Sequence, residues 1–147
     1  LKKGEKVLIE AKGIDYMLVN ALVEEAYKVG AYPFVELYDN RITRKLLMGQ
    51  TEEQAKLRAK YDSFRMAEMD AYIGIRGGEN CNELCDVPED KMKLESEIYS
   101  HPVHHEIRVK KTKWVVLRYP NQGMAQQACM STDAFENFYF NSNGKCN

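Results

Sequence analysis

The feature that most constrains the fold is a regular alternation between two hydrophobic periods along the chain. Short runs rich in β-branched and aromatic residues, which favour strands, alternate with longer segments whose apolar residues recur at helical spacing. The strand-like runs are residues 5–11, 32–38, 71–77 and 113–119. Strands separated by helices favour βαβ units. The sequence therefore predicts an α/β fold with a mostly parallel open sheet and helices on both faces, of the three-layer, doubly wound type.

The helical segments carry recognisable start signals. Residues 15–29 have an apolar stripe at helical spacing, with Asp15 as the candidate N-cap. Thr51 and Gln54 have the spacing of a capping box at the start of a helix predicted over residues 51–69. The apolar residues near one face of that helix are Leu57, Tyr61, Phe64 and Ala67.

Two prolines and one N-cap residue help to place the remaining elements. Asp39 can cap a short helix over residues 41–48. Pro88 suits the first position of a charged helix that we expect to end at Ser100. Pro33 lacks a backbone donor, so it is tolerated at the first turn of its strand or in an edge strand, but less well in a central position.

Composition narrows the class of protein. With 147 residues the chain has the length of one domain, and its formal charge of −1 gives no basic excess for nucleic acid or anionic lipid. No apolar run approaches the ~20 residues needed to span a membrane, and the start lacks the apolar core of a signal peptide. The four cysteines do not indicate a disulfide scaffold. We expect a cytoplasmic protein with reduced thiols and, since no initiator Met is present, a processed or excised piece of it.

Ligands of open α/β sheets usually bind beyond the carboxyl ends of the strands. Those ends include Asp39, Asn40 and Arg41 after the second predicted strand. The residues that we predict to face a ligand follow the third and fourth strands. They are Arg76, Glu79, Asn80, Tyr119, Asn121 and Gln122.

Two motifs in the chain invite a chemical interpretation, and for both a plainer interpretation is favoured. The segment GIRGGEN has neither G-x-G-x-x-G nor a Walker lysine, so a tight turn after a strand explains it better than a phosphate loop. A second group has the residue types of a zinc site but not a standard spacing, and its histidines lie in a polar stretch. Its members are Cys81, Cys85, His101, His104 and His105.

No catalytic signature is present in the chain. There is no nucleophile elbow, no catalytic-cysteine motif and no H-E-x-x-H, and the paired glutamates are typical of solvated helix faces. We therefore assign no catalytic and no metal-binding residue.

The last predicted helix is unusually apolar for a chain with only a short polar tail after it. Residues 131–147 comprise this helix and the tail. Its aromatic face could pack on the sheet, but a face left in water would mark an interface. We predict that the face contacts a further domain through Phe135, Phe138, Tyr139 and Phe140.

Several segments resemble one known family in the same order along the chain. They are KKGEKVLIEA, AYKVGAYP, YIGIRGGENCNELCDVP and TKWVVLRYPNQGMAQQACMSTDAFENFYF. The chain resembles the N-terminal domain of the aminopeptidase S/T family, the thermophilic aminopeptidases, over essentially its whole length. Two departures are Asn121, where the family pattern has Thr, and Cys129, where it has Gly. They concern local turn geometry.

The resemblance implies that the parent protein is a metallo-aminopeptidase. Such an enzyme removes N-terminal residues from peptides with a pair of divalent metal ions, zinc or cobalt, held in a C-terminal catalytic domain. Residues 1–147 would then be a single non-catalytic α/β domain that supports the active-site cavity and a homodimer. The resemblance implies no metal and no peptidase activity for this part alone, and its partners would be the catalytic domain, a second copy and peptide substrates.

Two alternatives of a different class remain open at the sequence level. The chain could be a stand-alone module that holds a small ligand at its strand ends. It could also be a module that oligomerises through its aromatic helix.

Overall fold

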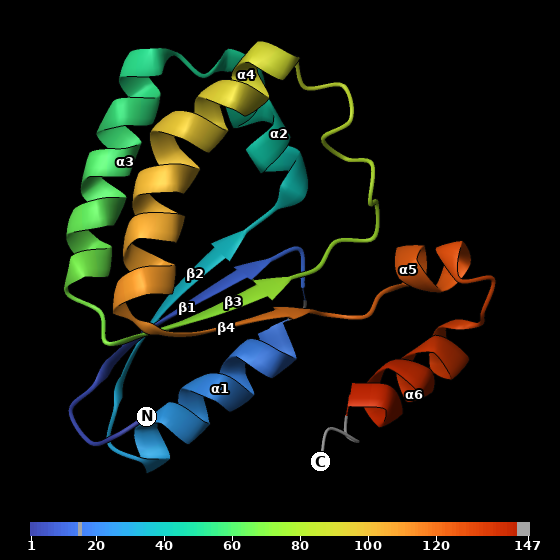
Figure 1. Cartoon of the computed structure of the whole chain (residues 1–147). Helices are drawn as coiled ribbons and strands as arrows, with labels where there is room; N and C mark the ends of the chain where they lie inside the picture. The colour runs from blue at the N-terminus through green and yellow to red at the C-terminus, as the bar shows by residue number, and fades with distance from the viewer. Residues whose placement is uncertain (15, 144–147) are drawn as a thin grey trace.

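A computed structural model describes residues 1–14 and 16–143 (Figure 1). The predicted N-cap Asp15 and the tail with Cys146 lie outside the described residues. The strands are β1 (Lys6–Lys12), β2 (Tyr32–Tyr38), β3 (Ala71–Arg76) and β4 (Lys113–Arg118). The helices are α1 (Tyr16–Lys28), α2 (Asn40–Gly49), α3 (Glu52–Ala67), α4 (Glu89–Leu94), the π-helical η1 (Glu95–Val109), α5 (Gln122–Gln127) and α6 (Thr132–Asn143).

The four strands form one parallel sheet in the order β2-β1-β3-β4. Helix α1 covers one face, and α3 with η1 covers the other, so the predicted α/β class with helices on both faces is confirmed (Figure 1). Pro33 lies in the edge strand β2. This position agrees with the expectation from its missing backbone donor.

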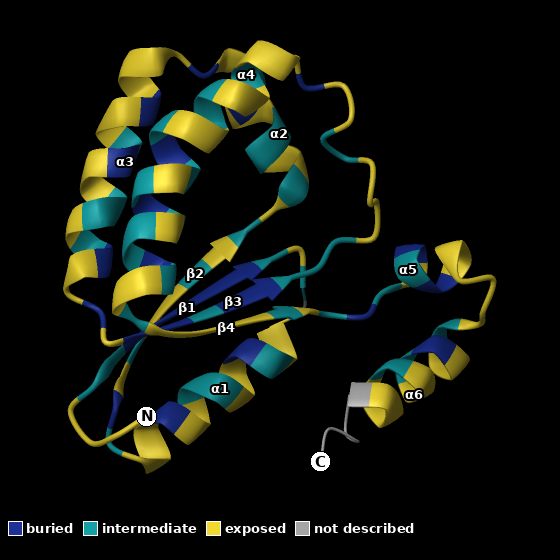
Figure 2. Ribbon diagram, viewed as in Figure 1, coloured by how far each residue is buried: buried dark blue, intermediate teal, exposed yellow. Residues whose placement is uncertain are grey.

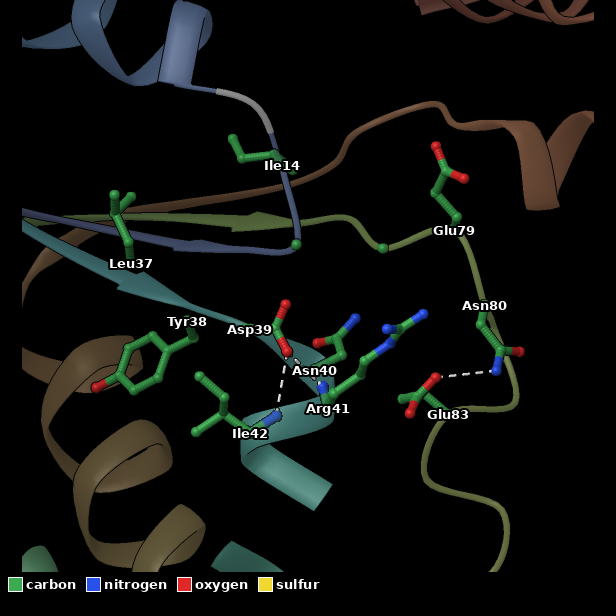
Figure 3. Close-up of a pocket in the computed structure, with 12 residues that line it drawn as sticks. Ile14, Leu37, Tyr38, Asp39, Asn40, Arg41, Ile42, Glu79, Asn80 and Glu83 are labelled. Carbon is green, nitrogen blue, oxygen red and sulfur yellow. Dashed lines mark hydrogen bonds between the residues drawn. The ribbon is translucent and has the colours of Figure 1, made fainter. Parts of the chain in front are cut away.

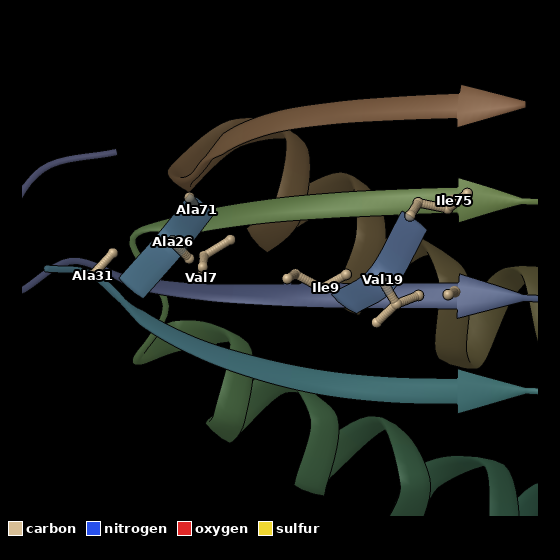
Figure 4. Close-up of a cluster of buried hydrophobic side chains, with 8 residues drawn as sticks. Val7, Ile9, Val19, Ala26, Ala31, Ala71 and Ile75 are labelled. Carbon is tan, nitrogen blue, oxygen red and sulfur yellow. The ribbon is translucent and has the colours of Figure 1, made fainter. Parts of the chain in front are cut away.

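The face of the sheet under α1 is packed with small and branched side chains (Figure 4). Val7 and Ile9 point from the central strand β1 toward Val19 and Ala26 of α1, and Ile75 joins them from β3. The alternation of side chains along a strand sends Leu8 and Glu10 to the opposite face. Because both of its faces are covered, β1 is buried along most of its length (Figure 2).

The opposite face of the sheet is closed by α3 and η1, which also pack against each other. Ala59 and Met66 of α3, Val103 of η1, and Leu8 and Tyr72 of the sheet form this second apolar cluster. Small alanines on the inner side of α3 allow η1 to approach closely. The side of α3 with these small residues therefore faces η1, and the opposite side faces solvent.

The apolar stripe predicted along α3 is not the side that packs. Leu57, Tyr61 and Phe64 have exposed fractions of 46%, 66% and 75%. The buried residues of the helix are Ala55, Ala59 and Met66 instead. Periodicity alone identifies a face but does not say what covers it, and here the large residues form an outward apolar face.

The helix after Pro88 continues beyond the predicted end at Ser100, so that boundary was wrong. It runs through α4 and η1 to Val109 and includes Pro102. Tyr99 and Val103, four residues apart, are both buried against the second apolar cluster. Tertiary packing of this face outweighs the hydrogen bond that Pro102 cannot make.

Local capping chemistry is as the sequence predicts. The Asp39 carboxylate accepts hydrogen bonds from the backbone N–H groups of Arg41 and Ile42 at the start of α2. The Thr51 hydroxyl accepts from the backbone N–H of Gln54 at the start of α3. A further short helix, α5, forms between β4 and the last helix.

No helix in the described part of the chain is long and apolar enough to cross a membrane. Helices α5 and α6 follow β4 and lie beyond the carboxyl-end side of the sheet, away from the two helical layers (Figure 1). They border the region in which the strand ends meet.

Candidate ligand site at the carboxyl ends of the strands

Two neighbouring cavities open at the carboxyl ends of the strands. The first has a volume of about 650 Å³ and lies between the end of β2, the start of α2 and the loop after β3 (Figure 3). The second has a volume of about 510 Å³ and lies between α2, the loop after β3 and α5. Asn40, Gly78, Asn80 and Glu83 line both cavities. The two cavities therefore share a wall.

The shared wall is built around a Gly-Gly turn held by two asparagines. The Asn40 amide donates to the carbonyl of Gly77 (3.2 Å), and the Asn121 amide donates to the carbonyl of Gly78 (2.9 Å). Gly78 has φ +109°, and a Cβ there would overlap the Asn40 amide. A side chain at this position would be strained. The turn after β3 is thus fixed from both sides.

The third contributor to the site is the loop that leads into α5. Asn121 caps α5 by accepting from the backbone N–H of Met124 (2.9 Å). A Cβ on the buried Gly123 would overlap the backbone carbonyl of Glu79, so the two loops touch through their main chains. Close approach of this kind requires glycine. It joins the ends of β3 and β4 into one rim.

The two cavities differ in charge. The charged groups of the first are Asp39, Arg41, Glu79 and Glu83. The second is lined by Lys12, Arg76 and Arg118, and its one described carboxylate is Glu83. The first cavity is therefore mainly acidic and the second mainly basic.

The three cations of the second cavity end three adjacent strands in register. Lys12 of β1 pairs with Arg76 of β3, and Arg76 pairs with Arg118 of β4. Neighbouring strands lie about 4.8 Å apart, and laterally paired residues point to the same face. We call Lys12, Arg76 and Arg118 the cationic row.

Behind the cationic row lies a buried carboxylate with several partners. Glu10 is 2% exposed and accepts from Arg108 of η1 (2.8 Å), which is itself 3% exposed. The Tyr72 hydroxyl also donates to Glu10 (3.1 Å), and Lys12 and Arg76 approach it at 3.5 and 3.4 Å. One carboxylate therefore faces three cations.

These neighbours determine the protonation states of the buried groups. Burial by itself would raise the pKa of Glu10, but Lys12, Arg108 and Arg76 hold it below its ordinary value. Burial lowers the pKa of Lys12, and the positive charges of Arg76 and Arg108 lower it further against the attraction of Glu10. Burial raises the pKa of Tyr72 to about 12, so this hydroxyl stays protonated. The network is ionised at its carboxylate and neutral at its phenol.

The residues predicted to face a ligand divide between the cavities and their surroundings. Arg76, Asn80 and Asn121 line the basic cavity, and Glu79 and Asn80 line the acidic one. Tyr119 and Gln122 line neither cavity. Tyr119 packs against the cluster under α1 and meets the Phe140 ring edge-on, with the ring centroids 6.3 Å apart.

Sequence reasoning missed three charged residues of this region, Lys12, Arg118 and Arg108. The signal for the first two was available, because each is the basic residue that ends a strand-like run. Arg108 gave no such signal. It lies beyond the predicted end of its helix and meets Glu10 only through the tertiary fold.

The group with the residue types of a zinc site is not assembled into one. Among the described residues, no cluster of three or more His, Cys, Asp or Glu is placed to hold a metal ion. The Cys81 thiol lies at the basic cavity, where Gln127 donates to it (2.9 Å), whereas the three histidines lie along η1. The described residues thus do not fit a metal pair, and we derive no chemical step through one.

The aromatic face of α6 is only partly covered. Phe135 is 8% exposed, but Phe138 and Phe140 are 59% and 50% exposed. Tyr139 is half-buried, and its hydroxyl donates to the backbone carbonyl of Arg118 at the end of β4. Tyr139 and Phe140 therefore connect the helix to the end of β4 and to Tyr119 after it, while Phe135 is the buried aromatic residue of the helix.

An all-parallel open sheet with helices on both faces and cavities at its carboxyl ends defines the three-layer α/β class. Within that class the chain belongs to the thermophilic metalloprotease family (M29), which its sequence matches over residues 1–143. A search of curated proteins gives no significant match.

A solved structure, wild-type AmpT from Thermus thermophilus, has the same fold over most of this chain. The TM-score is 0.60 at 21% sequence identity, and the match covers 84% of this chain and 33% of that chain. This protein therefore spans about a third of the AmpT chain. At this level of identity the likeness concerns the fold.

Proposed function

We propose that this chain is the non-catalytic N-terminal domain of a metal-dependent aminopeptidase, an enzyme that removes N-terminal residues from peptides. The observation that carries the proposal is membership of the metalloprotease family combined with a match to only a third of the AmpT chain. The residues that would hold two divalent metal ions, zinc or cobalt, then lie in a C-terminal domain. When bound, such a metal pair activates water and polarises the scissile carbonyl.

In this proposal the domain supports the active-site cavity from its carboxyl-end rim. That rim is rigid, since Asn40 and Asn121 hold the turn after β3 and Gly123 touches the main chain of Glu79. A rigid wall suits a cavity whose substrate must be held in one orientation.

The surface that would contact the catalytic domain is the aromatic face of α6. Phe138 is 59% exposed and Phe140 is 50% exposed. Helix α6 also lies next to the end of β4, to which Tyr139 is hydrogen-bonded. A homodimer, a cytoplasmic location and peptide substrates belong to the same proposal. The outward apolar face of α3, with Leu57, Tyr61 and Phe64, is a further surface for such an assembly.

The first test is peptidase activity. The purified chain, with zinc or cobalt added, is expected to release no chromophore from aminoacyl p-nitroanilides above the buffer rate. A longer protein from the same reading frame, if it contains the metal-binding half, serves as the positive control. Metal-dependent activity that stays with the 147-residue chain through repeated purification would show the proposal to be wrong.

The second candidate function is a stand-alone binding module. The observation in its favour is the pair of cavities at the strand ends, which do not need another domain to form. An encoded reading frame that ends with this chain would favour this alternative. A longer frame with Glu, His and Asp ligands for two metals would favour the aminopeptidase domain.

A further inference from the structure

We infer that the cationic row is a binding site for the carboxylate of a small ligand. Lys12, Arg76 and Arg118 stand side by side across β1, β3 and β4 and line a cavity of about 510 Å³. In the proposed enzyme that ligand is a short peptide held by its terminal carboxylate, and this assignment of the ligand rests on the proposed function.

The first argument is the balance of charge. Like charges in laterally paired positions of a sheet destabilise it, and the fold places three of them in one row. Glu10 compensates the row from behind, but it is already bound by the buried Arg108. The cavity is thus left with a positive excess that an anionic guest would neutralise.

The second argument is accessibility. The side chains of Lys12 and Arg76 are 30% and 32% exposed, and both line the cavity. Arg118 is exposed and makes no ion pair within residues 1–14 and 16–143. Arg118 therefore has its guanidinium free to bind a carboxylate through two parallel hydrogen bonds.

The third argument concerns what else the cavity offers. Asn80, Asn121 and Gln127 place neutral amides on the walls around the row. Each amide already donates one hydrogen bond, to Glu83, Gly78 and Cys81 respectively, and its second N–H can donate to a carbonyl group of a peptide. A lone inorganic ion would leave most of the cavity empty. A peptide-sized anion fits both the charge and the volume better than a small ion does.

Binding is tested by titrating the isotope-labelled chain with the tripeptide Leu-Gly-Gly and following backbone amide resonances. We expect shifts at Gly77, Gly78 and Asn121. The same peptide with an amidated C-terminus should bind about tenfold more weakly, because one charge-assisted interaction is lost. Raising the ionic strength should weaken the binding of the peptide with a free C-terminal carboxylate and leave the binding of the amidated peptide nearly unaffected.

Two variants test whether the cationic row is the part of the protein that binds the peptide. Arg118→Gln removes a cation that has no ion-pair partner in the described part of the chain, and it is expected to reduce affinity for the free acid about tenfold. Lys93→Gln is the matched control, since Lys93 is a surface cation on α4 whose side chain is 70% exposed. It should bind as the unaltered chain does. The resonance spectrum of each variant shows whether it remains folded.

A titration with inorganic phosphate tests whether the site prefers a peptide carboxylate or a small inorganic anion. Phosphate that binds more weakly than the tripeptide acid supports a peptide carboxylate. Equal affinity for phosphate and peptide, equal affinity for acid and amide, or unaltered binding in Arg118→Gln would each overturn the inference. None of these results depends on peptidase activity, so a failure here leaves the proposed function standing, and the activity test can fail independently.

Discussion

At the scale of single residues, Glu10 has the largest electrostatic role in this fold. Its carboxylate lies on the central strand, 2% exposed, and Arg108 is brought to it from 98 positions further along the chain. Burying a charge is unfavourable unless it is paired and hydrogen-bonded. Glu10 meets that condition through Arg108 and Tyr72, and it also lies 3.5 and 3.4 Å from Lys12 and Arg76 at the strand ends, whose charge it offsets only in part.

Replacing Glu10 by Gln should therefore destabilise the chain strongly. The change keeps the shape of the side chain but leaves the buried Arg108 without its anion, which costs about 3–5 kcal/mol. Urea unfolding at pH 7 measures the loss. Glu68→Gln is the control, because Glu68 forms an exposed pair with Lys6 and such pairs contribute about 0–1 kcal/mol.

The same substitution should change the acid dependence of stability. The pKa of Glu10 is lowered by folding, so its contribution is present above the unfolded value of about 4.3 and is lost as the pH falls through the folded value. The Gln variant lacks this contribution at every pH. A variant with unchanged stability at pH 7 would contradict the role assigned to Glu10.

At the scale of elements, α6 is a helix that this domain covers only in part. Only Phe135 of its four aromatic residues is buried, and the Tyr139 hydroxyl connects the helix to β4 through a hydrogen bond. The ring of Phe140 touches Tyr119, yet half of Phe140 remains exposed. The sequence pattern identified an apolar helix, and the structure divides its face into a covered and an uncovered half.

This division predicts different effects for two similar substitutions. Phe135→Ala should lower the free energy of unfolding by roughly 2 kcal/mol, less than a deep core position because α6 lies at the edge of the fold. Phe138→Ala should change it by less than about 0.5 kcal/mol. Thermal unfolding compares them. Equal losses in the free energy of unfolding would mean that Phe135 and Phe138 are equally covered, which would contradict the division of the α6 face into a covered and an uncovered half.

At the scale of the whole molecule, both edges of the sheet expose apolar side chains. Edge strand β4 carries Trp114, Val115 and Val116 with exposed fractions of 49%, 53% and 38%, and Phe34 and Val35 of β2 are 44% and 42% exposed. Exposed apolar edge strands readily associate with other surfaces. Both edge strands are therefore candidate contact surfaces.

The single tryptophan of the chain can report on such covering. In the chain alone, Trp114 is half-exposed and should be quenched readily by acrylamide. If a catalytic domain covers β4 in a longer protein, the emission of Trp114 should shift to the blue and quenching should fall, with any added tryptophans replaced by Phe. Unchanged emission and quenching would indicate that β4 stays open.

Much of the fold was predictable because its signals are local. Alternating hydrophobic periods predicted the strands and a mostly parallel sheet, and the caps at Asp39 and Thr51 form as their spacing suggested. Pro33 indicated an edge strand for a local reason, its missing donor. The predictions failed where packing outweighs local preference, as with the outward face of α3 and the continuation of η1 through Pro102.

The sequence by itself therefore determined the elements, the class of sheet and the family, since these depend on periodicity and on motifs along the chain. Only the tertiary structure decided that Lys12, Arg76 and Arg118 stand in one row, because strand order and register bring together residues that are far apart in the sequence. The same holds for Arg108, whose charge acquires a role only when η1 packs on the sheet beside Glu10.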